Sequence, residues 1–159
     1  MAKETKDIVA GPVEMDFSAL LDDQPTPNLL VYSRESAIAE KFEALVSLNI
    51  LTSRMKDIYD ILFLAEREKF SFFTLQEAIM ATFAQRATQL EDRHVLFSSD
   101  FSASRDKETQ WNAFLRRSRL QLSPTLPEAM ARFKAFLEPV CSSVVMNNAT
   151  WNPSDWNWT

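Results

Sequence analysis

The sequence predicts an all-α fold, a helical bundle of about five helices behind an extended N-terminal lead-in. Glycine is scarce: the 159 residues contain one, Gly11, where an average chain has about 7%. Few glycines and few β-branched runs favour helices over tight-turned sheets. The chain is also 46% hydrophobic, with twelve Phe and four Trp, and can bury one sizeable core. We therefore expect a single globular unit.

The extended lead-in is expected over residues 1–32. There Pro12, Pro25 and Pro27 remove backbone donors and disfavour helix in the residues before them. Its end, NLLVYS, predicts either a short strand or an apolar strap. Residues 1–23 hold two Lys against six acids and so carry most of the chain's net charge of -5. The nearly neutral remainder lacks the basic field of a general nucleic-acid binder.

A helical bundle is expected over residues 33–145, and it begins with two paired helices. Ser33 is the predicted N-cap of the first, RESAIAEKFEALVSLNI. The second should start near Thr52 or Ser53 and run to about Lys69. Because only the short segment NILT joins them, the two helices must form a neighbouring antiparallel pair.

Three further helices complete the predicted bundle. The third has a capping box, Thr74 to Glu77, before AIMATFAQRAT. The fourth covers KETQWNAFLRRSR. The fifth has a second box, Thr125 to Glu128, and we expect Pro139 to end it, because proline inside a helix removes a backbone hydrogen bond.

The tail, residues 146–159, places Trp151, Trp156 and Trp158 in a non-helical stretch. Large rings commonly pack a tail onto a bundle, because they bury much apolar area. A surface on which nucleobases stack is the alternative interpretation. We expect a tail packed on the bundle.

Residue counts exclude several chemistries. One glycine cannot build a Walker loop or a dinucleotide-binding turn. One histidine, His94, and one cysteine, Cys141, leave no His/Cys zinc site, disulfide framework or redox thiol pair. We interpret Cys141 as a small core residue, and His94 has no nearby nucleophile pattern. No segment approaches the roughly 20 apolar residues that cross a bilayer, and the charged N-terminus is no secretory signal, so we expect a cytoplasmic protein without membrane contact.

Lys41 is the exception in its own helix. On a helical wheel it lies inside the apolar stripe, whereas Glu40 and Glu43 fall on the opposite side, where solvated charges belong. One interpretation is structural: the methylene stem lies along apolar surface and the ammonium reaches water or an acid. The other is that the ammonium serves a binding site.

The second helix opens with four charged residues, Arg54, Lys56, Asp57 and Asp60. Cations in a first turn oppose the positive end of the helix dipole, and acids three residues apart repel each other. An ordinary surface network of ion pairs would explain them and would be worth little energetically. The antiparallel pairing offers an alternative, because it brings Lys41 towards Asp57 or Asp60. Together with the free N–H groups of the helix start, these residues would make a phosphate-binding corner.

The segments YSRESAIAEKFEALVSL and SRMKDIYDILFLAE resemble the AbiEii/AbiGii nucleotidyltransferase-toxin family, in which an AEK segment precedes an RxKDxxD segment. The likeness extends more weakly to the terminal tryptophans and covers most of residues 12–158. It implies that Lys41 contacts the triphosphate and that Asp57 is needed for activity. Arg54, Lys56 and Asp60 match the same motif and would support the pocket.

The same resemblance implies a function. Family members look like toxins of toxin–antitoxin and abortive-infection systems that move a nucleotide from a nucleoside triphosphate onto an RNA acceptor, in some cases a transfer RNA end. One departure is large: the family's core begins with a Gly-Ser or Gly-Gly turn and an Asp-x-Asp pair that holds Mg²⁺ against the triphosphate. This sequence has neither, and the adjacent Asp22 and Asp23 would point to opposite faces of a strand.

Two classes of function therefore stay open. In the first, the chain corresponds to the C-terminal portion of a family member, with residues 1–32 as a remnant of the catalytic sheet. It would bind neither Mg²⁺ nor nucleotide strongly by itself, and a complementing N-terminal chain would supply the metal-binding carboxylates. Nucleoside triphosphate, transfer RNA and an antitoxin would be its other partners. In the second class, the chain is a non-catalytic helical interaction module or a decayed remnant.

Overall fold

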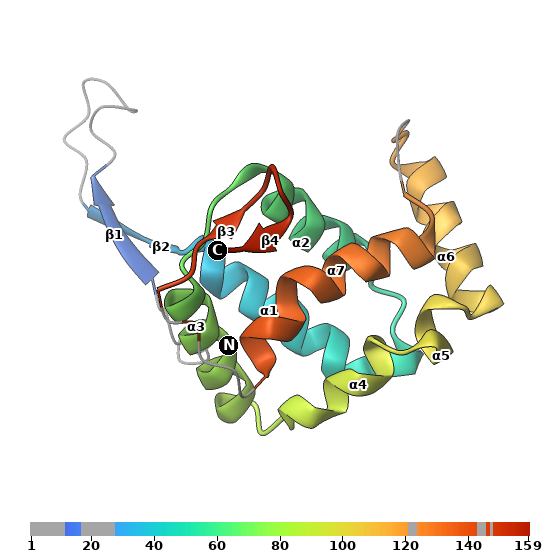
Figure 1. The fold of residues 1–159 in the computed structure, drawn as a ribbon, viewed down its shortest axis with the longest axis horizontal. Coiled ribbons are helices and arrows are strands. Elements are labelled where there is room, and N and C mark those ends of the chain that lie inside the picture. The colour runs from blue at the N-terminus through green and yellow to red at the C-terminus, as the bar shows by residue number, and fades with distance from the viewer. Residues whose placement is uncertain (1–11, 17–27, 121–123, 143–145, 147) are drawn as a thin grey trace.

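The computed structural model describes residues 12–16, 28–120, 124–142, 146 and 148–159 (Figure 1). Its elements are, in chain order, β1 (Pro12–Asp16), β2 (Asn28–Tyr32), α1 (Arg34–Leu48), η2 (Asn49–Leu51), α2 (Met55–Arg67), α3 (Phe72–Gln85), η3 (Leu90–Asp92), α4 (Arg93–Leu96), α5 (Ser99–Ser102), α6 (Arg105–Arg117), α7 (Leu126–Cys141), β3 (Trp151–Asn152) and β4 (Asn157–Trp158). Within these residues the fold is all-α with two small strand pairs, so the predicted class is confirmed. In these described stretches, no helix is long and apolar enough to cross a bilayer.

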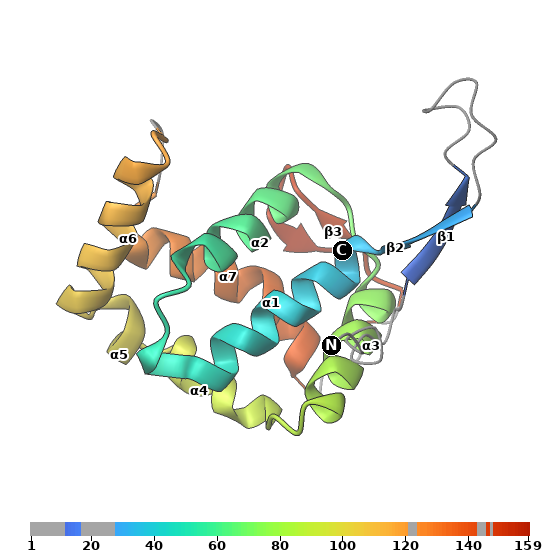
Figure 2. The same cartoon turned by 180° about the vertical axis from the view of Figure 1, so that it is seen from behind.

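Helix α1 lies at the centre of the bundle (Figure 2). It packs against α2 and α3, and α7 packs on both of these helices. The buried ring of Phe42 in α1 contacts Phe83, Phe97 and Phe133, with ring centroids 5.4, 6.0 and 6.0 Å away. Because large rings from several elements enclose it, α1 is a well-fixed base for any side chain that it carries.

A predicted strand and a predicted helix cap are present near the start of the bundle. The segment NLLVYS contains strand β2, which pairs antiparallel with β1 and places Val31 opposite Val13. Ser33 caps α1 as predicted, since its Oγ accepts the backbone N–H of Ser36 at 3.0 Å.

Helix α2 begins later than predicted, at Met55, and ends at Arg67 rather than Lys69. The delay has a local cause. Thr52 Oγ1 accepts the backbone N–H of Arg54 at 3.1 Å, and Arg54 keeps a non-helical backbone. No side chain caps the first turn of α2.

Two other helix starts also shifted. The expected capping box at Thr74 is wrong: α3 begins at Phe72, and the Oγ of Ser71 accepts the backbone N–H of Thr74 at 3.3 Å. Phe72 is fully buried, which draws it into the first turn of the helix. Likewise, α6 begins slightly earlier than predicted, with Ser104 as its N-cap.

The last helix keeps its predicted start but not its predicted end. Thr125 and Glu128 form the reciprocal capping box at the start of α7. The prediction that Pro139 ends this helix is wrong, because α7 continues past it. The backbone N–H of Ser142 still donates to the Glu138 carbonyl at 3.0 Å, so the proline removes one donor without stopping the final turn.

The tail is held on the bundle by its tryptophans. Their indole N–H groups donate to backbone carbonyls: Trp151 to Ala65 at 2.7 Å, Trp156 to Arg132 at 3.0 Å and Trp158 to Phe136 at 2.9 Å. Trp151 and Trp158 are buried. Their rings belong to the core and do not form a surface on which bases stack.

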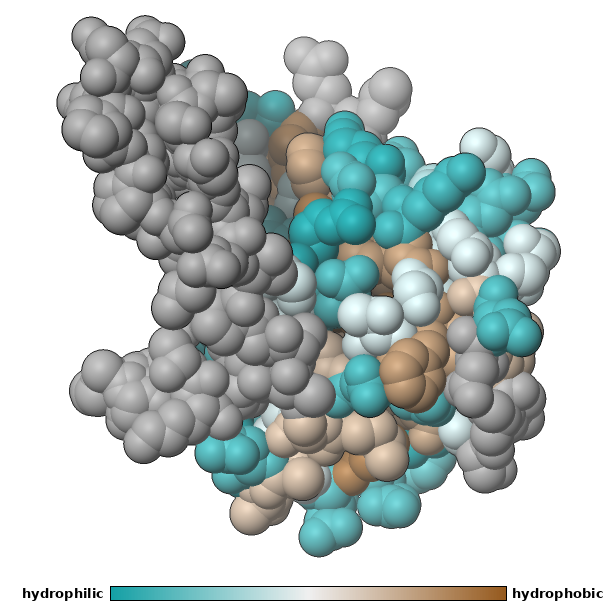
Figure 3. All heavy atoms as spheres, turned by 90° about the vertical axis from the view of Figure 1, so that its left-hand side faces the viewer, coloured by the Kyte–Doolittle hydropathy of each residue, from teal (hydrophilic) through white to brown (hydrophobic). Residues whose placement is uncertain are grey.

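The outer side of α3 is solvent-exposed. Figure 3 faces the end of the molecule where β1, β2 and α3 lie, and hydrophobic and hydrophilic areas alternate among its coloured residues. Phe73 and Met80 of α3 are both exposed. The inner side of this helix packs on α1, so residues on that side can contribute to a site that α1 carries.

The loop after α3 has a strained backbone. Ala87 has a φ of 56°, in the left-handed region that glycine usually occupies. The N–H of Thr88 donates to the Phe83 carbonyl at 2.9 Å and that of Ala87 to the Ala84 carbonyl at 3.2 Å, which is the Schellman pattern at a helix end. This arrangement fixes the residues on both sides of Ala87, Arg86 and Thr88.

Ala87→Gly should stabilise the protein. Glycine adopts a positive φ without the steric cost that alanine has, so we expect the free energy of unfolding to rise by about 1 kcal/mol. Ala84→Gly, in the exposed last turn of α3, is the matched control and should lower it by up to about 1 kcal/mol. Denaturant unfolding measures both values, and equal destabilisation by the two substitutions would contradict the assigned backbone.

Candidate functional site

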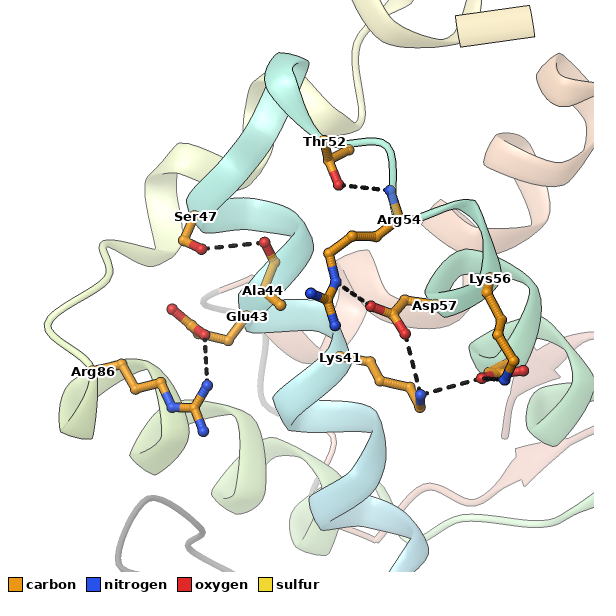
Figure 4. A network of polar contacts seen from close by, with 10 residues as sticks. Lys41, Glu43, Ala44, Ser47, Thr52, Arg54, Lys56, Asp57 and Arg86 are labelled. Atoms are coloured by element: carbon orange, nitrogen blue, oxygen red, sulfur yellow. Dashed lines mark hydrogen bonds and ion pairs between the residues drawn. The ribbon is translucent and has the colours of Figure 1, made fainter. Parts of the chain in front are cut away.

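Lys41 meets the charged start of α2. Its Nζ lies 3.2 Å from Oδ1 of Asp57 and 3.1 Å from Oδ2 of Asp60 (Figure 4). The short connection through η2 makes α1 and α2 neighbours, so two residues sixteen positions apart become a hydrogen-bonded pair. The convergence that the sequence predicted is therefore present.

Asp57 is the most buried member of this cluster, with 9% of its side chain exposed. Both of its oxygens are engaged: Oδ1 accepts from Lys41, and Oδ2 accepts from Nε of Arg54. Asp60 is more open, and its Oδ2 also accepts from Nζ of Lys56 at 2.7 Å. Three cations thus surround two carboxylates, and all five predicted site residues lie together.

These contacts keep the ammonium of Lys41 charged. Burial alone would lower the pKa of Lys41, but its hydrogen bonds to Asp60 and Asp57 and the charges of these acids outweigh burial. The net effect raises the pKa of Lys41 above its ordinary value of 10.5. At neutral pH this side chain is a fixed positive charge.

A hollow of about 330 Å³ opens beside Lys41. It is lined by Ala37, Glu40, Lys41, Ala44, Arg54 and Arg86. The two alanines give it a small-residue floor on α1. Three of the lining residues are cations and one is an acid, whereas Asp57 and Asp60 do not line it. The acids thus stand behind the cations that face the hollow, an arrangement suited to an anionic group.

The third cation, Arg86, was not foreseen from the sequence. It lies at the end of α3, and its Nη1 is 3.3 Å from Oε1 of Glu43. The expectation that Glu43 is solvated is wrong: only 6% of its side chain is exposed, and it also accepts from Oγ1 of Thr88 at 2.6 Å. The reason is that α3 packs on the face of α1 that a single apolar stripe leaves to solvent. No local motif signals this.

The described residues do not fit a magnesium site. Both oxygens of Asp57 accept from cations, and Oδ2 of Asp60 pairs with two lysines, so the charge of both acids is already offset by cationic side chains. Over the described ranges, no group of three His, Cys, Asp or Glu could hold a metal ion. Asp22 and Asp23 lie outside the described residues.

The remaining single-copy residues lie elsewhere. Cys141 is buried in the core, and burial raises the pKa of its thiol to about 12, so the thiol stays protonated at neutral pH. His94 is exposed on the short helix α4. Neither residue lines the hollow beside Lys41.

Comparison with known protein families shows to which family the chain belongs. A family model described as "Nucleotidyl transferase AbiEii toxin, Type IV TA system" matches residues 5–139. The chain belongs to this AbiEii family. Comparisons with curated proteins and with solved structures found no match. The AbiEii match includes the whole of α1 and α2 and so every predicted site residue. A type IV toxin–antitoxin family implies an antitoxin as partner.

Removing the two carboxylates should lower the pKa of Lys41. The double variant Asp57→Asn, Asp60→Asn keeps the side-chain shapes and removes both negative charges, whereas the burial that disfavours the ammonium remains. We expect the pKa of Lys41 to fall below its native value. NMR titration of the lysine ε-carbons measures it, with the Lys134 signal as internal reference.

The sign of the effect on stability follows from the same shift. Because the pKa of Lys41 is raised in the folded state, its ion pairs contribute their full stability below about pH 10.5. That contribution is lost as the pH rises through the native pKa. A Lys41 pKa that is identical in the native and double-variant proteins would contradict these ion pairs.

Proposed function

We propose that the hollow beside Lys41 binds the phosphates of a nucleoside triphosphate, as the nucleotide-pocket portion of an AbiEii nucleotidyltransferase toxin. One observation carries the proposal. The cations Lys41 and Arg54 line the hollow, while Asp57, which holds both of them, does not. A buried acid that orients two cations towards open space leaves their outward N–H groups available for a second anion.

The proposed reaction is nucleotidyl transfer onto RNA. The acceptor hydroxyl attacks the α-phosphorus and gives up its proton to solvent. A new phosphorus–oxygen bond forms, the bond between the α-phosphorus and the β-phosphate oxygen breaks, and pyrophosphate leaves. Lys41 and Arg54 offset the negative charge of the phosphates and keep the chain of phosphates in place. Transfer RNA is the acceptor that we propose, and the cytoplasm is where these substrates occur.

The proposal assigns binding and orientation to this chain, but no metal chemistry. Paired acidic ligands of the Gly-Ser/Asp-x-Asp type are absent from the 159 residues. We propose that these ligands come from outside the 159 residues and that these residues alone bind nucleotide weakly and transfer none. Incorporation of labelled nucleotide into total RNA by the purified chain would contradict this point.

A second candidate function has an observation of its own. Leu48, Ile50 and Leu51 are exposed where α1 leads into η2, and 83% of Leu51 is accessible. An apolar group at a helix end is typical of an interaction surface. In this candidate, the chain is a non-catalytic helical module, and nucleotide binding is absent.

Lys41→Ala should weaken nucleotide binding by about tenfold or more, because it removes a charge-assisted contact to phosphate. Isothermal titration with ATP measures the dissociation constant, and the native affinity should fall as salt is added. Lys134→Ala, at an exposed position of α7, is the matched control and should bind as the native protein does.

Folding must be separated from binding in this experiment. Lys41→Ala leaves Asp57 with one cationic partner, so circular dichroism should first establish that the variant is folded at the titration temperature. Lys41→Arg keeps the charge and should retain most of the affinity. Equal ATP affinity in folded Lys41→Ala and the native protein would overturn the proposed pocket.

A further inference from the structure

The structure points to a specificity-determining residue in this hollow. We propose that Arg86 is a further phosphate-binding cation and that it makes the hollow select nucleoside triphosphates over monophosphates. The inference rests on the proposed function and adds to it the discrimination by phosphate number. It is drawn from three features: the position of Arg86, the way it is held, and the spread of cations around the floor.

Arg86 approaches the hollow from a different helix than the other cations. Lys41 projects from α1, Arg54 precedes α2, and Arg86 ends α3, so three elements each contribute one cation (Figure 4). The floor between them consists of Ala37 and Ala44. These small side chains leave the three cationic groups accessible from the same space.

Two carboxylates hold Arg86 in place: Glu43, which does not line the hollow, and Glu40, which does. Nη1 of Arg86 is 3.3 Å from Glu43, and its Nη2 is 3.6 Å from Glu40. Glu43 is itself fixed by Thr88, on the other side of the strained Ala87. A guanidinium carries five N–H donors in one plane and can pair with carboxylates and a phosphate at the same time. The strained loop therefore fixes a cation that is partly exposed to the hollow.

The proposed preference for triphosphates over monophosphates follows from the positions of the three cations around the floor. Lys41 and Arg54 share Asp57 and act as one unit that suits a single phosphate group. Arg86 belongs to a separate unit with Glu43 and Glu40, on the α3 side of the floor. A monophosphate is satisfied by the first unit, whereas a triphosphate extends further and meets both. Arg86 should thus add affinity for ATP and little for AMP.

The test compares ATP and AMP by isothermal titration. Arg86→Ala alone would leave the buried Glu43 carboxylate uncompensated, so the variant to use is Arg86→Ala with Glu43→Gln, measured against Glu43→Gln. ATP affinity should fall by about tenfold and AMP affinity by less than about twofold. Arg86→Lys should recover part of the ATP affinity. Arg116→Ala, at an exposed position of α6, should change neither.

The outcomes separate this inference from the proposed function. If native protein and Lys41→Ala differ in ATP affinity but the Arg86 double variant matches its Glu43→Gln reference, Arg86 has no such role and the pocket stands. Equal losses for ATP and AMP overturn the selectivity. If the native protein binds no ATP at all, the proposed function fails and this inference fails with it.

Discussion

The site depends on the ion pairs that the Asp57 carboxylate makes with two cations. This carboxylate is nearly buried, it lies in the first turn of α2, and it accepts hydrogen bonds from Lys41 of the neighbouring helix and from Arg54 just before its own. Lys41 and Arg54 together offset its charge, so removing either one leaves this nearly buried carboxylate with a single cationic partner. Asp57 therefore links α1 to α2, and together with Asp60 it orients the ammonium of Lys41.

A similar arrangement is found on the other side of α1. Glu43 is buried against α3 and holds Arg86, much as Asp57 is buried beside α2 and holds Lys41. The central helix thus carries an ion pair to each neighbour, with a floor of small residues between them. In both pairs the acid is the more buried partner and the cation the more exposed one. This order gives the hollow its positive lining in a chain whose net charge is negative.

Structural features that depend on local or pairwise rules could be predicted from the sequence. The Ser33 cap follows from residue preference at a helix start, and the meeting of Lys41 with Asp57 follows from a short connection and two helical wheels. Glu43 could not be predicted in this way, because a wheel with one apolar stripe does not show that α1 is enclosed on two sides. Pro139 was misjudged because it stands so close to the end of α7 that one lost donor has little effect. The alanine in the left-handed position at Ala87 has no sequence signal at all.

The most direct measurement follows the Lys41 side chain itself during nucleotide addition. In an NMR titration, the ε-methylene resonance of Lys41 should shift in a saturable way with ATP and should stay in place with adenosine, which has the same base and ribose but no phosphate. A hollow that binds phosphate through Lys41 would give this contrast. A Lys41 resonance that ATP leaves unmoved, or that adenosine shifts equally, would contradict it.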